Sequence, residues 1–277
     1  MKKLFIPILA VLSMTAVSCN KELNVPESES NQIKVRLEFS LAGSSVGTRA
    51  AGDAVADTEA ERTVNNYDIF FFRSNGTLDT YYGATSDIGQ GTLSTNTTGA
   101  FTTDEFYVSN ETLDIYVIAN APVALKSSVT SLATLNSAVS EFTQNTSSNF
   151  VMVGYKQQNV ANLTPDKDVK FITGIELERI VNKVTLGKVY KQFDSPALQA
   201  ANVFIEGIYI VNAVKQVNYT AKLGGADAVP TAANSSYYNY NATWESNSLI
   251  TSTYATAKTV TAAGVSCGTS LYFYPNP

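Results

Sequence analysis

Ile33-Lys34-Val35-Arg36-Leu37-Glu38-Phe39-Ser40-Leu41 is the stretch that decides the fold, because apolar and polar residues alternate through it without a break. A period of two predicts a β-strand, in which successive side chains point to opposite faces of a sheet. One face carries every apolar residue of the stretch, namely Ile33, Val35, Leu37, Phe39 and Leu41. We expect that face to be buried and the polar residues between them to face solvent.

Short apolar runs separated by turn residues recur on the C-terminal side of this stretch. We expect strands at residues 67–73, 78–82, 100–108, 113–119, 149–155, 169–172, 175–189, 203–212, 214–223 and 270–274. Asn75-Gly76 lies between the first two and is typical of a tight hairpin turn. Residues 126–142, whose apolar positions step by three and four, predict a helix with Ser127 or Ser128 as its cap. Many short strands and few helices favour an all-β fold with minor α content, built from antiparallel β-sandwiches.

The composition allows a large core and argues against several kinds of chemistry. Of the 277 residues 44% are hydrophobic, which is enough for one large or two ordinary domains. The chain has no histidine, so it lacks the commonest general base and the usual zinc ligand. Without a Gly-rich phosphate loop or a setting for paired carboxylates, we expect no catalytic residue, no metal and no cofactor. The net charge of −5, with no basic cluster after Lys3, argues against nucleic acid as a partner.

The first residues are typical of an export signal. Residues 1–18 contain two lysines and then a mostly apolar run that is too short to span a membrane as a helix. Cys19 follows Ala16-Val17-Ser18, which resembles a bacterial lipobox, and this resemblance implies that Cys19 is lipidated. We therefore expect an outer-membrane lipoprotein moored by acyl chains, with residues 19–32 as a flexible tether. The alternative is an ordinary cleaved signal with an incidental cysteine.

Residues 42–63 differ in composition from the segments around them. They are rich in glycine, alanine and acidic residues and carry no hydrophobic period, so we expect a long, accessible connection. Two arginines, Arg49 and Arg62, lie in this connection. Connections of such length inside a compact domain are often functional.

A series of separated segments follows in order behind the signal. They are residues 68–72 (DIFFF), 75–78 (NGTL), 115–122 (IYVIANAP), 150–153 (FVMV), 175–186 (IELERIVNKVTL), 208–212 (IYIVN) and 271–277 (LYFYPNP). In this order they resemble the fimbrillin family, the FimA- and Mfa-like subunits of type V pili. The resemblance covers most of the chain from Ile33 onward, and the part around residues 177–184 is the most specific.

The resemblance implies both a fold and a route of assembly. It implies two transthyretin-like β-sandwich domains, at residues 33–174 and 175–277, of which the second is incomplete because family members continue past the equivalent of residues 272–277. It also implies an arginine-specific protease that cuts in the loop after the first strand, between Arg49 and Ala50, with Arg62 as the rival site. Loss of the strand then opens a groove for a strand of another subunit, and a filament results.

The sequence therefore predicts a structural subunit of a cell-surface fimbria that is exported as a lipoprotein and assembled by donor-strand exchange. Within the family, the alternative is an anchor or tip subunit with an adhesin role toward a host or bacterial surface ligand. From another class, the alternative is a glycan-binding surface lipoprotein, because aromatic rings beside asparagines can stack on sugars. Its candidate contacts are Tyr237, Tyr238, Tyr240 and Trp244. A tyrosine-rich loop that packs on its own sandwich explains the same residues more simply.

Overall fold

The structure is a computed structural model, and it describes residues 31–42, 60–84, 100–223, 237–240, 247 and 249–274. The export signal, Cys19, the expected cleavage pair Arg49 and Ala50, and Trp244 lie outside the described residues. The predicted removable strand and Arg62 lie within them. The described chain is mostly β-strand, as the sequence predicted.

The first layer of the N-terminal sandwich is an antiparallel sheet in the order β3-β2-β6-β8. Its strands are β2 (Tyr67–Arg73), β3 (Leu78–Ala84), β6 (Thr112–Ala119) and β8 (Met152–Asn159). The hairpin predicted at Asn75-Gly76 joins β2 to β3, and Gly76 takes φ +79°, a left-handed conformation that favours glycine. The side chain of Asn75 accepts a hydrogen bond from the Thr77 amide at 3.0 Å, which fixes the turn.

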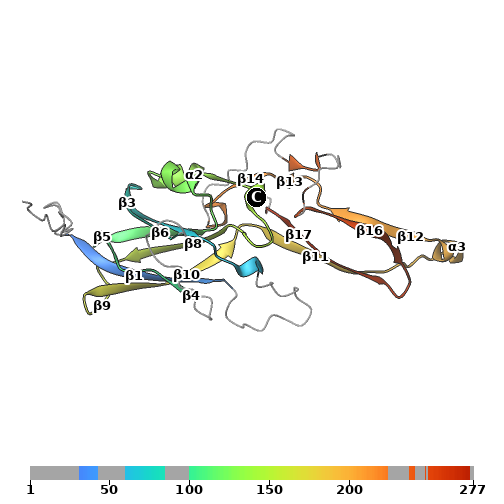
Figure 1. Ribbon diagram of the computed structural model, residues 1–277, viewed down its shortest axis with the longest axis horizontal. Helices are drawn as coiled ribbons and strands as arrows, with labels where there is room; N and C mark the ends of the chain where they lie inside the picture. The colour runs from blue at the N-terminus through green and yellow to red at the C-terminus, as the bar shows by residue number, and fades with distance from the viewer. Residues whose placement is uncertain are drawn as a thin grey trace, which may run out of the picture. The chain divides into compact units, whose positions relative to one another are not determined.

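The second layer holds the first strand in its interior. Strand β1 (Gln32–Leu41) pairs with β10 (Val169–Arg179) along one edge and with β4 (Ala100–Thr102) and β5 (Phe106–Ser109) along the other. Figure 1 shows β1 in blue beside β10. The β1–β10 pairing is parallel, so the expectation of purely antiparallel sheets is wrong here; the other pairs among the described strands are antiparallel.

Strand β10 joins the two layers. Its first part pairs with β1, and Glu178 and Arg179 near its end pair with β8. The sequence predicted separate strands on either side of Thr173-Gly174, but β10 runs through these residues with a shift of register. At this shift Gly174 takes φ +76°, a left-handed conformation that glycine adopts at a β-bulge without steric cost. The short β9 (Pro165–Asp166) pairs with the start of β10.

The two layers enclose the first hydrophobic core. The alternation of β1 places its apolar face in this core, where Val35, Leu37, Phe39 and Leu41 are buried. The opposite layer contributes alternate residues of β2 and β6, namely Tyr67, Ile69, Phe71, Leu113, Ile115, Val117 and Ala119. Because the remaining residues of β2 face a second core, this strand is buried on both sides along most of its length.

The region predicted as one helix is divided into three elements, so that prediction is wrong. They are α1 (Ala124–Ser128), α2 (Leu132–Ser137) and β7 (Val139–Glu141). The cap is Ser131, not Ser127 or Ser128: its side chain accepts from the Thr134 amide, and the Thr134 hydroxyl accepts from the Ser131 amide. The three- and four-residue spacing reflects apolar side chains from different elements that pack on the second core, namely Val129, Leu132, Leu135 and Phe142, whereas Val139 is exposed.

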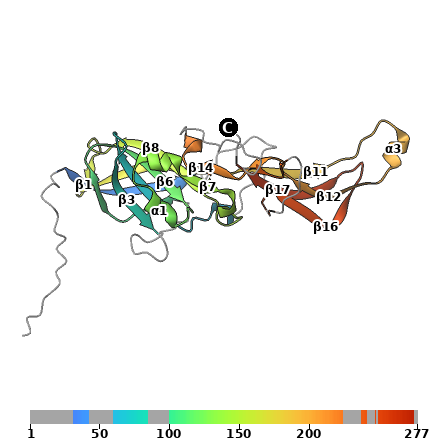
Figure 2. The same ribbon diagram turned by 90° about the horizontal axis from the view of Figure 1, so that it is seen from above.

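The remaining described chain consists of β-ribbons and short elements. Figure 2 shows two ribbons, in which β11 (Asn182–Val189) pairs with β17 (Val265–Phe273) and β12 (Val203–Tyr209) pairs with β16 (Thr251–Val260). The short elements are η1 (Ala60–Arg62), η2 (Phe142–Gln144), α3 (Pro196–Ala200), β13 (Ala213–Val214), β14 (Gln216–Asn218), η3 (Ala221–Leu223) and β15 (Tyr237–Tyr238). Strand β14 pairs with β7, and β13 pairs with β15.

The second hydrophobic core lies on the other face of the first layer. Here Phe70 and Phe72 of β2 are buried together with side chains from the C-terminal elements. The ring of Tyr272 lies 4.7 Å from that of Phe150, and the Tyr274 hydroxyl donates to the Ser140 carbonyl at 3.1 Å. This core takes residues from both sides of the predicted domain boundary near residue 174, and the boundary itself stays a prediction.

Candidate functional site: the slot of the first strand

We call the place that β1 occupies, between β10 and the edge formed by β4 and β5, the β1 slot. The ring of Phe39 stacks on Phe101 at 5.3 Å and meets Tyr67 edge-on at 5.0 Å, so an aromatic pocket receives it. The Leu37 amide donates to the Thr103 hydroxyl, and the Thr103 amide donates to the Leu37 carbonyl, both at 3.0 Å. The slot therefore packs against the apolar side chains of β1 and provides hydrogen-bond partners for its backbone.

All five residues predicted for the removable strand lie in this slot. Four of them are buried, and Ile33, near the start of the strand, is partly buried and packs against the same core. On the opposite face of β1, Lys34 and Arg36 both pair with Glu105, at 3.3 Å and 3.2 Å. The structure thus places the strand as the alternation predicts, while its removal stays a prediction.

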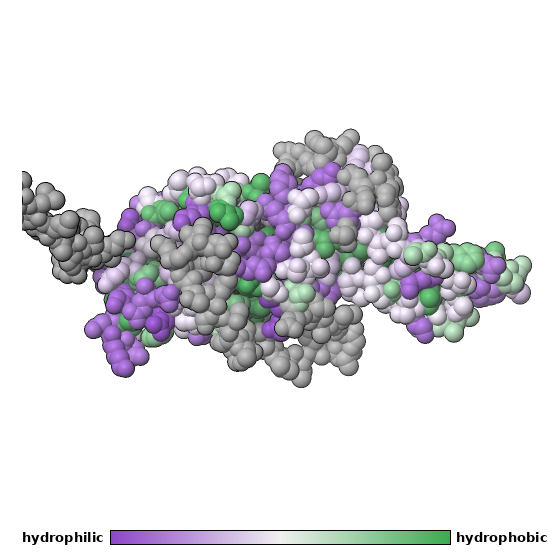
Figure 3. All heavy atoms as spheres, in the orientation of Figure 1, coloured by the Kyte–Doolittle hydropathy of each residue, from purple (hydrophilic) through white to green (hydrophobic). Residues whose placement is uncertain are grey.

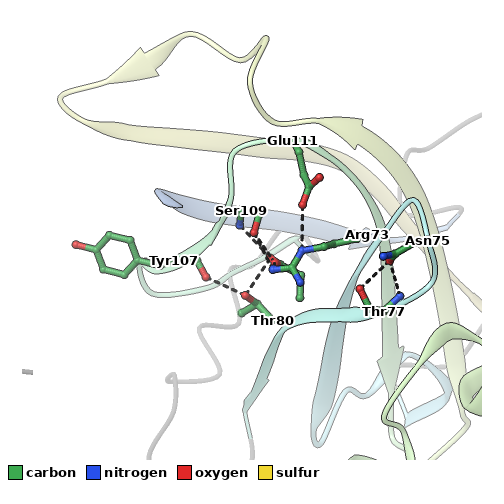
Figure 4. Close-up of polar contacts among 8 residues, drawn as sticks. Arg73, Asn75, Thr77, Thr80, Tyr107, Ser109 and Glu111 are labelled. Carbon is green, nitrogen blue, oxygen red and sulfur yellow. Dashed lines mark hydrogen bonds and ion pairs between the residues drawn. The ribbon is translucent and has the colours of Figure 1, made fainter. Parts of the chain in front are cut away.

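The β5 side of the slot is braced by a polar cluster that does not include β1. Asp79 of β3 is buried and accepts from the Arg73 guanidinium at 2.5 Å and from the Ser109 amide at 2.9 Å. Figure 4 shows Arg73 reaching both Ser109 and Glu111, and the Arg73–Glu111 pair measures 3.1 Å. In the same view the Thr80 hydroxyl donates to the Tyr107 carbonyl at 3.1 Å. These contacts tie β5 to the β2–β3 hairpin.

The β10 side of the slot is braced by a buried lysine. The ammonium of Lys170 donates to the carbonyls of Val160 and Ala161 at 2.8 Å and 3.0 Å, and to the Asn110 side chain at 3.4 Å. A buried ammonium is tolerated only when such acceptors replace water. Strand β4 is different, because within the described chain it pairs with β1 alone. Removal of β1 would therefore leave β5 and β10 held and β4 without its strand partner.

The chain enters the sandwich again through a short segment that is held by buried polar contacts. Glu61 in η1 is buried, and its carboxylate lies 2.9 Å from the Lys183 ammonium and accepts a hydrogen bond from the Tyr272 hydroxyl. Arg179 approaches the same carboxylate at 3.9 Å. Glu61 is therefore tied to strands β10, β11 and β17.

Asn120 holds the same segment from the end of β6. It takes φ +60°, and its side chain accepts from the Asn65 amide at 2.7 Å and donates to the Thr63 carbonyl at 2.8 Å. It also donates to the Phe150 carbonyl at 2.9 Å. We call residues 61–65, held by Glu61 and Asn120, the clasp. The side chain of Arg62 is exposed, but its backbone lies between these two anchors.

Burial changes the ionisation of side chains around the slot. Desolvation, with Tyr82 and Asp104 nearby, raises the pKa of Tyr67 well above its usual value, so this phenol beneath Phe39 is neutral. Burial also raises the pKa of Asp68 on the other face of β2, against the opposing effect of a hydrogen bond from the Tyr81 hydroxyl. Neither of these two groups is arranged as a base beside a nucleophile.

The candidate glycan contacts within the described chain pack on the second core. The Tyr238 ring lies 5.7 Å from Phe142 and under the Lys215 ammonium at 4.7 Å, and Tyr237 packs beside Tyr240 at 6.4 Å. All three tyrosines are partly buried. This is the arrangement of a loop that packs on its own sandwich, and the glycan site stays a prediction.

Among the described residues, no group of three or more histidine, cysteine, aspartate or glutamate side chains is arranged to hold a metal ion. No helix in that part of the chain is long and apolar enough to cross a membrane. Cys267 is buried there as a free thiol in β17.

The sequence did not indicate Glu61, Asn120 or Glu105 as functional residues. Glu61 lies in an acidic, alanine-rich stretch in which nothing distinguishes it from its neighbours. Its partners lie more than a hundred residues later in the chain, so only the fold brings them together. Asn120 offers a weak signal, since asparagine at the end of a strand tolerates the left-handed conformation it adopts.

The chain was compared with known families and with known sequences. The model of the family "Major fimbrial subunit protein (FimA)" matches residues 35–186, more than half of the chain. This range begins in β1 and ends in β11, so it includes the slot and both of its sides. No curated protein sequence matches the chain significantly.

Solved structures with a similar fold include proteins of Parabacteroides distasonis and Porphyromonas gingivalis. A candidate cell adhesion protein of Parabacteroides distasonis has a TM-score of 0.64 at 16% identity, over 88% of this chain and 70% of its own. A second such protein from that organism has a TM-score of 0.55 at 13% identity, over 88% and 71%. A fimbrilin (FimA) of Porphyromonas gingivalis has a TM-score of 0.50 at 13% identity, over 84% and 65%. At these identities the likeness concerns the fold alone.

Proposed function

The chain belongs to the FimA family of major fimbrial subunits, and from this premise we propose that it polymerises by exchanging β1 for a strand of another subunit. In this proposal the protein is exported as a lipoprotein through Cys19 and is cut by an arginine-specific protease between Arg49 and Ala50. Strand β1 then leaves its slot, and a strand from a neighbouring subunit enters. The protein builds the filament and performs no chemistry itself.

The position of β1 in the sheet is the observation that carries the proposal. The strand lies in the interior of its layer, and its partners β4, β5 and β10 are all distant in sequence. No hairpin therefore connects β1 to a neighbouring strand. A single cut after the strand leaves it held only by hydrogen bonds and side-chain packing, so an equivalent strand can replace it without a change in the rest of the fold.

The sides of the slot support the same proposal. An open slot exposes apolar surface and unpaired backbone groups, which favours the binding of another strand. The clusters around Asp79 and Lys170 hold β5 and β10 without help from β1. The β5 and β10 sides of the slot can therefore stay in place for an incoming strand while β1 is absent.

The clasp supports Arg49 rather than Arg62 as the cleavage site. A protease binds its substrate as an extended segment of several residues, and the backbone around Arg62 is held by Glu61 and Asn120. Cutting at Arg62 would require these buried contacts to break first. Arg49 lies outside the described residues and enters the proposal from the sequence alone.

N-terminal sequencing of the protein in surface fimbriae tests the proposal. We expect the mature chain to begin at Ala50, and Arg49→Ala to prevent both maturation and polymerisation. The matched control is Arg62→Ala, which removes the rival arginine and is expected to leave both unchanged. A polymerised chain that still begins at Cys19 would refute the cleavage step, and one that begins at Thr63 would move it to Arg62.

The N-terminus of the assembled chain and its position in the filament distinguish the anchor and tip alternatives from this role. An anchor keeps its lipid and begins at Cys19 in the assembled fimbria, whereas a tip subunit is matured but occurs at the end of the filament. Immunogold labelling along the fimbria distinguishes a tip from a shaft subunit. Labelling along the whole filament is expected for the proposed role.

A further inference from the structure

The outward face of β1 carries two neighbouring cations that share one carboxylate. Lys34 and Arg36 are two residues apart, so they lie on the same face of the strand. Glu105, in the link between β4 and β5, pairs with the Lys34 ammonium at 3.3 Å and with the Arg36 guanidinium at 3.2 Å. A single acidic side chain at the edge of the slot therefore contacts both charges.

Two exposed aromatic rings lie beside these two cations. Tyr107 lies opposite Lys34 in the β1–β5 pairing, and the ammonium is 6.0 Å from the centre of its ring. Phe171 lies opposite Arg36 in the β1–β10 pairing, and the guanidinium is 5.8 Å from the centre of its ring. The two rings are 56% and 40% exposed, although both are large and neither belongs to a hydrophobic core. Packing of the interior does not explain them.

These three residues belong to the sides of the slot and not to β1. Tyr107 is part of β5, whose backbone is tied to Thr80, and Phe171 is part of β10, which the buried Lys170 holds. When β1 leaves, the Glu105 carboxylate and the Tyr107 ring on one side, and the Phe171 ring on the other, lie beside the empty slot. Such a group attracts cations both by charge and through the ring faces, and it repels an acidic strand. We call Glu105, Tyr107 and Phe171 the outer platform.

We propose that the outer platform selects which strand enters the slot, by favouring one with basic residues at the outward positions that Lys34 and Arg36 occupy in β1. This inference rests on the proposed function and goes beyond it by naming the chemistry of the partner. The partner is a β-strand whose inward residues are apolar at alternate positions, with an aromatic residue in the Phe39 pocket. Its outward face carries one or two lysine or arginine residues opposite Glu105.

The outer platform contributes only a minor part of the affinity of the slot for an incoming strand. Exposed ion pairs and cation–π contacts are individually weak, so we expect a basic outer face to improve binding by roughly five- to thirtyfold over a neutral one. The buried apolar side chains supply most of the affinity. Because the platform is exposed, its preference should shrink at about 1 M salt, where charges are screened over about 3 Å.

Peptide exchange on the cleaved full-length protein tests the inference. The chain without residues 1–18 is cut by an arginine-specific protease and mixed with fluorescent peptides that span residues 32–42, and binding is followed by anisotropy. The peptides carry the native sequence, the neutral pair Lys34→Gln/Arg36→Gln, or the reversed pair Lys34→Glu/Arg36→Glu. The control peptide carries Glu38→Gln, which changes charge on the same face but away from Glu105.

We expect the order native, neutral, reversed, with the control peptide within about twofold of the native one. The Glu105→Gln protein should bind native and neutral peptides within about twofold, and Glu105→Lys should prefer the reversed peptide. Equal binding of all peptides to the wild-type protein overturns the inference but leaves the proposed function standing. Failure of the native peptide to exchange at all overturns both.

Discussion

The β1 slot and the β12–β16 ribbon contain similar strands in very different surroundings. Strand β1 has partners on both edges and a second layer over one face, and its Phe39 is 1% exposed. Strand β12 (VFIEGIY) is also rich in apolar residues, but within the described chain it pairs only with β16, and its Phe204 is 54% exposed. Apolar residues thus favour a strand in both places, whereas burial depends on what lies over the strand.

The difference extends to other C-terminal residues outside the second core. Val184, Leu198, Phe204 and Val211 are all about half exposed, and Figure 3 shows apolar residues in green among hydrophilic ones at the surface there. Stability is therefore concentrated in the two cores, and the ribbons add little. Each prediction below either breaks this contrast or measures it more finely.

The largest expected effect comes from emptying the aromatic pocket. Phe39→Ala should lower the free energy of unfolding by about 3–5 kcal/mol, because it leaves a cavity between Tyr67 and Phe101. The matched variant Phe204→Ala in the ribbon should cost less than about 1 kcal/mol. Urea unfolding of the uncleaved full chain measures both. Equal losses would show that the ribbon is as well packed in solution as the slot.

The clasp should give the next largest effect. Glu61→Ala leaves Lys183 and Arg179 around an empty site, and we expect a loss of about 2–4 kcal/mol because these cations are only partly exposed. The variant should also become cleavable at Arg62 in limited digestion with an arginine-specific protease, read by mass spectrometry.

The control for the clasp is Glu111→Ala. This exposed carboxylate also pairs with an arginine, but its loss should cost less than about 1 kcal/mol and should not open Arg62 to cleavage. Rapid cleavage of the wild-type chain at Arg62 would contradict the role assigned to the clasp.

Alanine substitutions at two glycines test how tightly the sandwich and the ribbon are packed. In Gly154→Ala the new methyl group would lie 2.8 Å from the Glu176 carbonyl oxygen, and we expect a loss of about 1–3 kcal/mol. In Gly187→Ala, on β11, nothing lies within 4 Å of the new methyl group. That change should be neutral or stabilise by about 0.4–1 kcal/mol, because it restricts the unfolded chain. Thermal unfolding of the two variants checks the opposite signs.

The second core should also make the stability depend on pH. Burial raises the pKa of Tyr219 from its ordinary value of 10 to about 12. Because the pKa is raised in the folded state, the stabilising contribution of the neutral Tyr219 is fully present below about pH 10. It then falls by about 1.4 kcal/mol per pH unit up to about pH 12. Tyr219→Phe should reduce this slope in urea unfolding at pH 9, 10 and 11. An unchanged slope would contradict the burial of its hydroxyl.

The sequence predicted the elements that depend on local patterns. The alternation of β1, the apolar run of β2 and the Asn75-Gly76 turn each identified a strand or hairpin that the structure confirms. Strand β16 was missed because its residues are mainly threonine, alanine and lysine, which carry no apolar alternation. A strand that is not buried on one face leaves no such pattern.

The errors arose where residues from different elements share one environment. The spacing in residues 126–142 imitated a helix because Val129, α2 and η2 all direct apolar side chains to the second core, whereas Val139 of β7 is 37% exposed. Thr173-Gly174 resembled a break because glycine is typical of turns, yet β10 continues through it. The slot was foreseen from the strand that fills it, whereas the clasp and the outer platform consist of contacts between distant segments and have no local signature.

The parallel pairing of β1 with β10 has a consequence for how the chain folds during its synthesis. A chain grows from its N-terminus, so β1 is made early and its parallel neighbour only after more than a hundred further residues. Until then the first strand lacks its β10 partner, and closing so long a loop slows the pairing. In the proposed assembly, the strand that completes its pairing only after β10 has been made is also the one that cleavage releases, so synthesis and assembly both pass through a sandwich with an incomplete β1 slot.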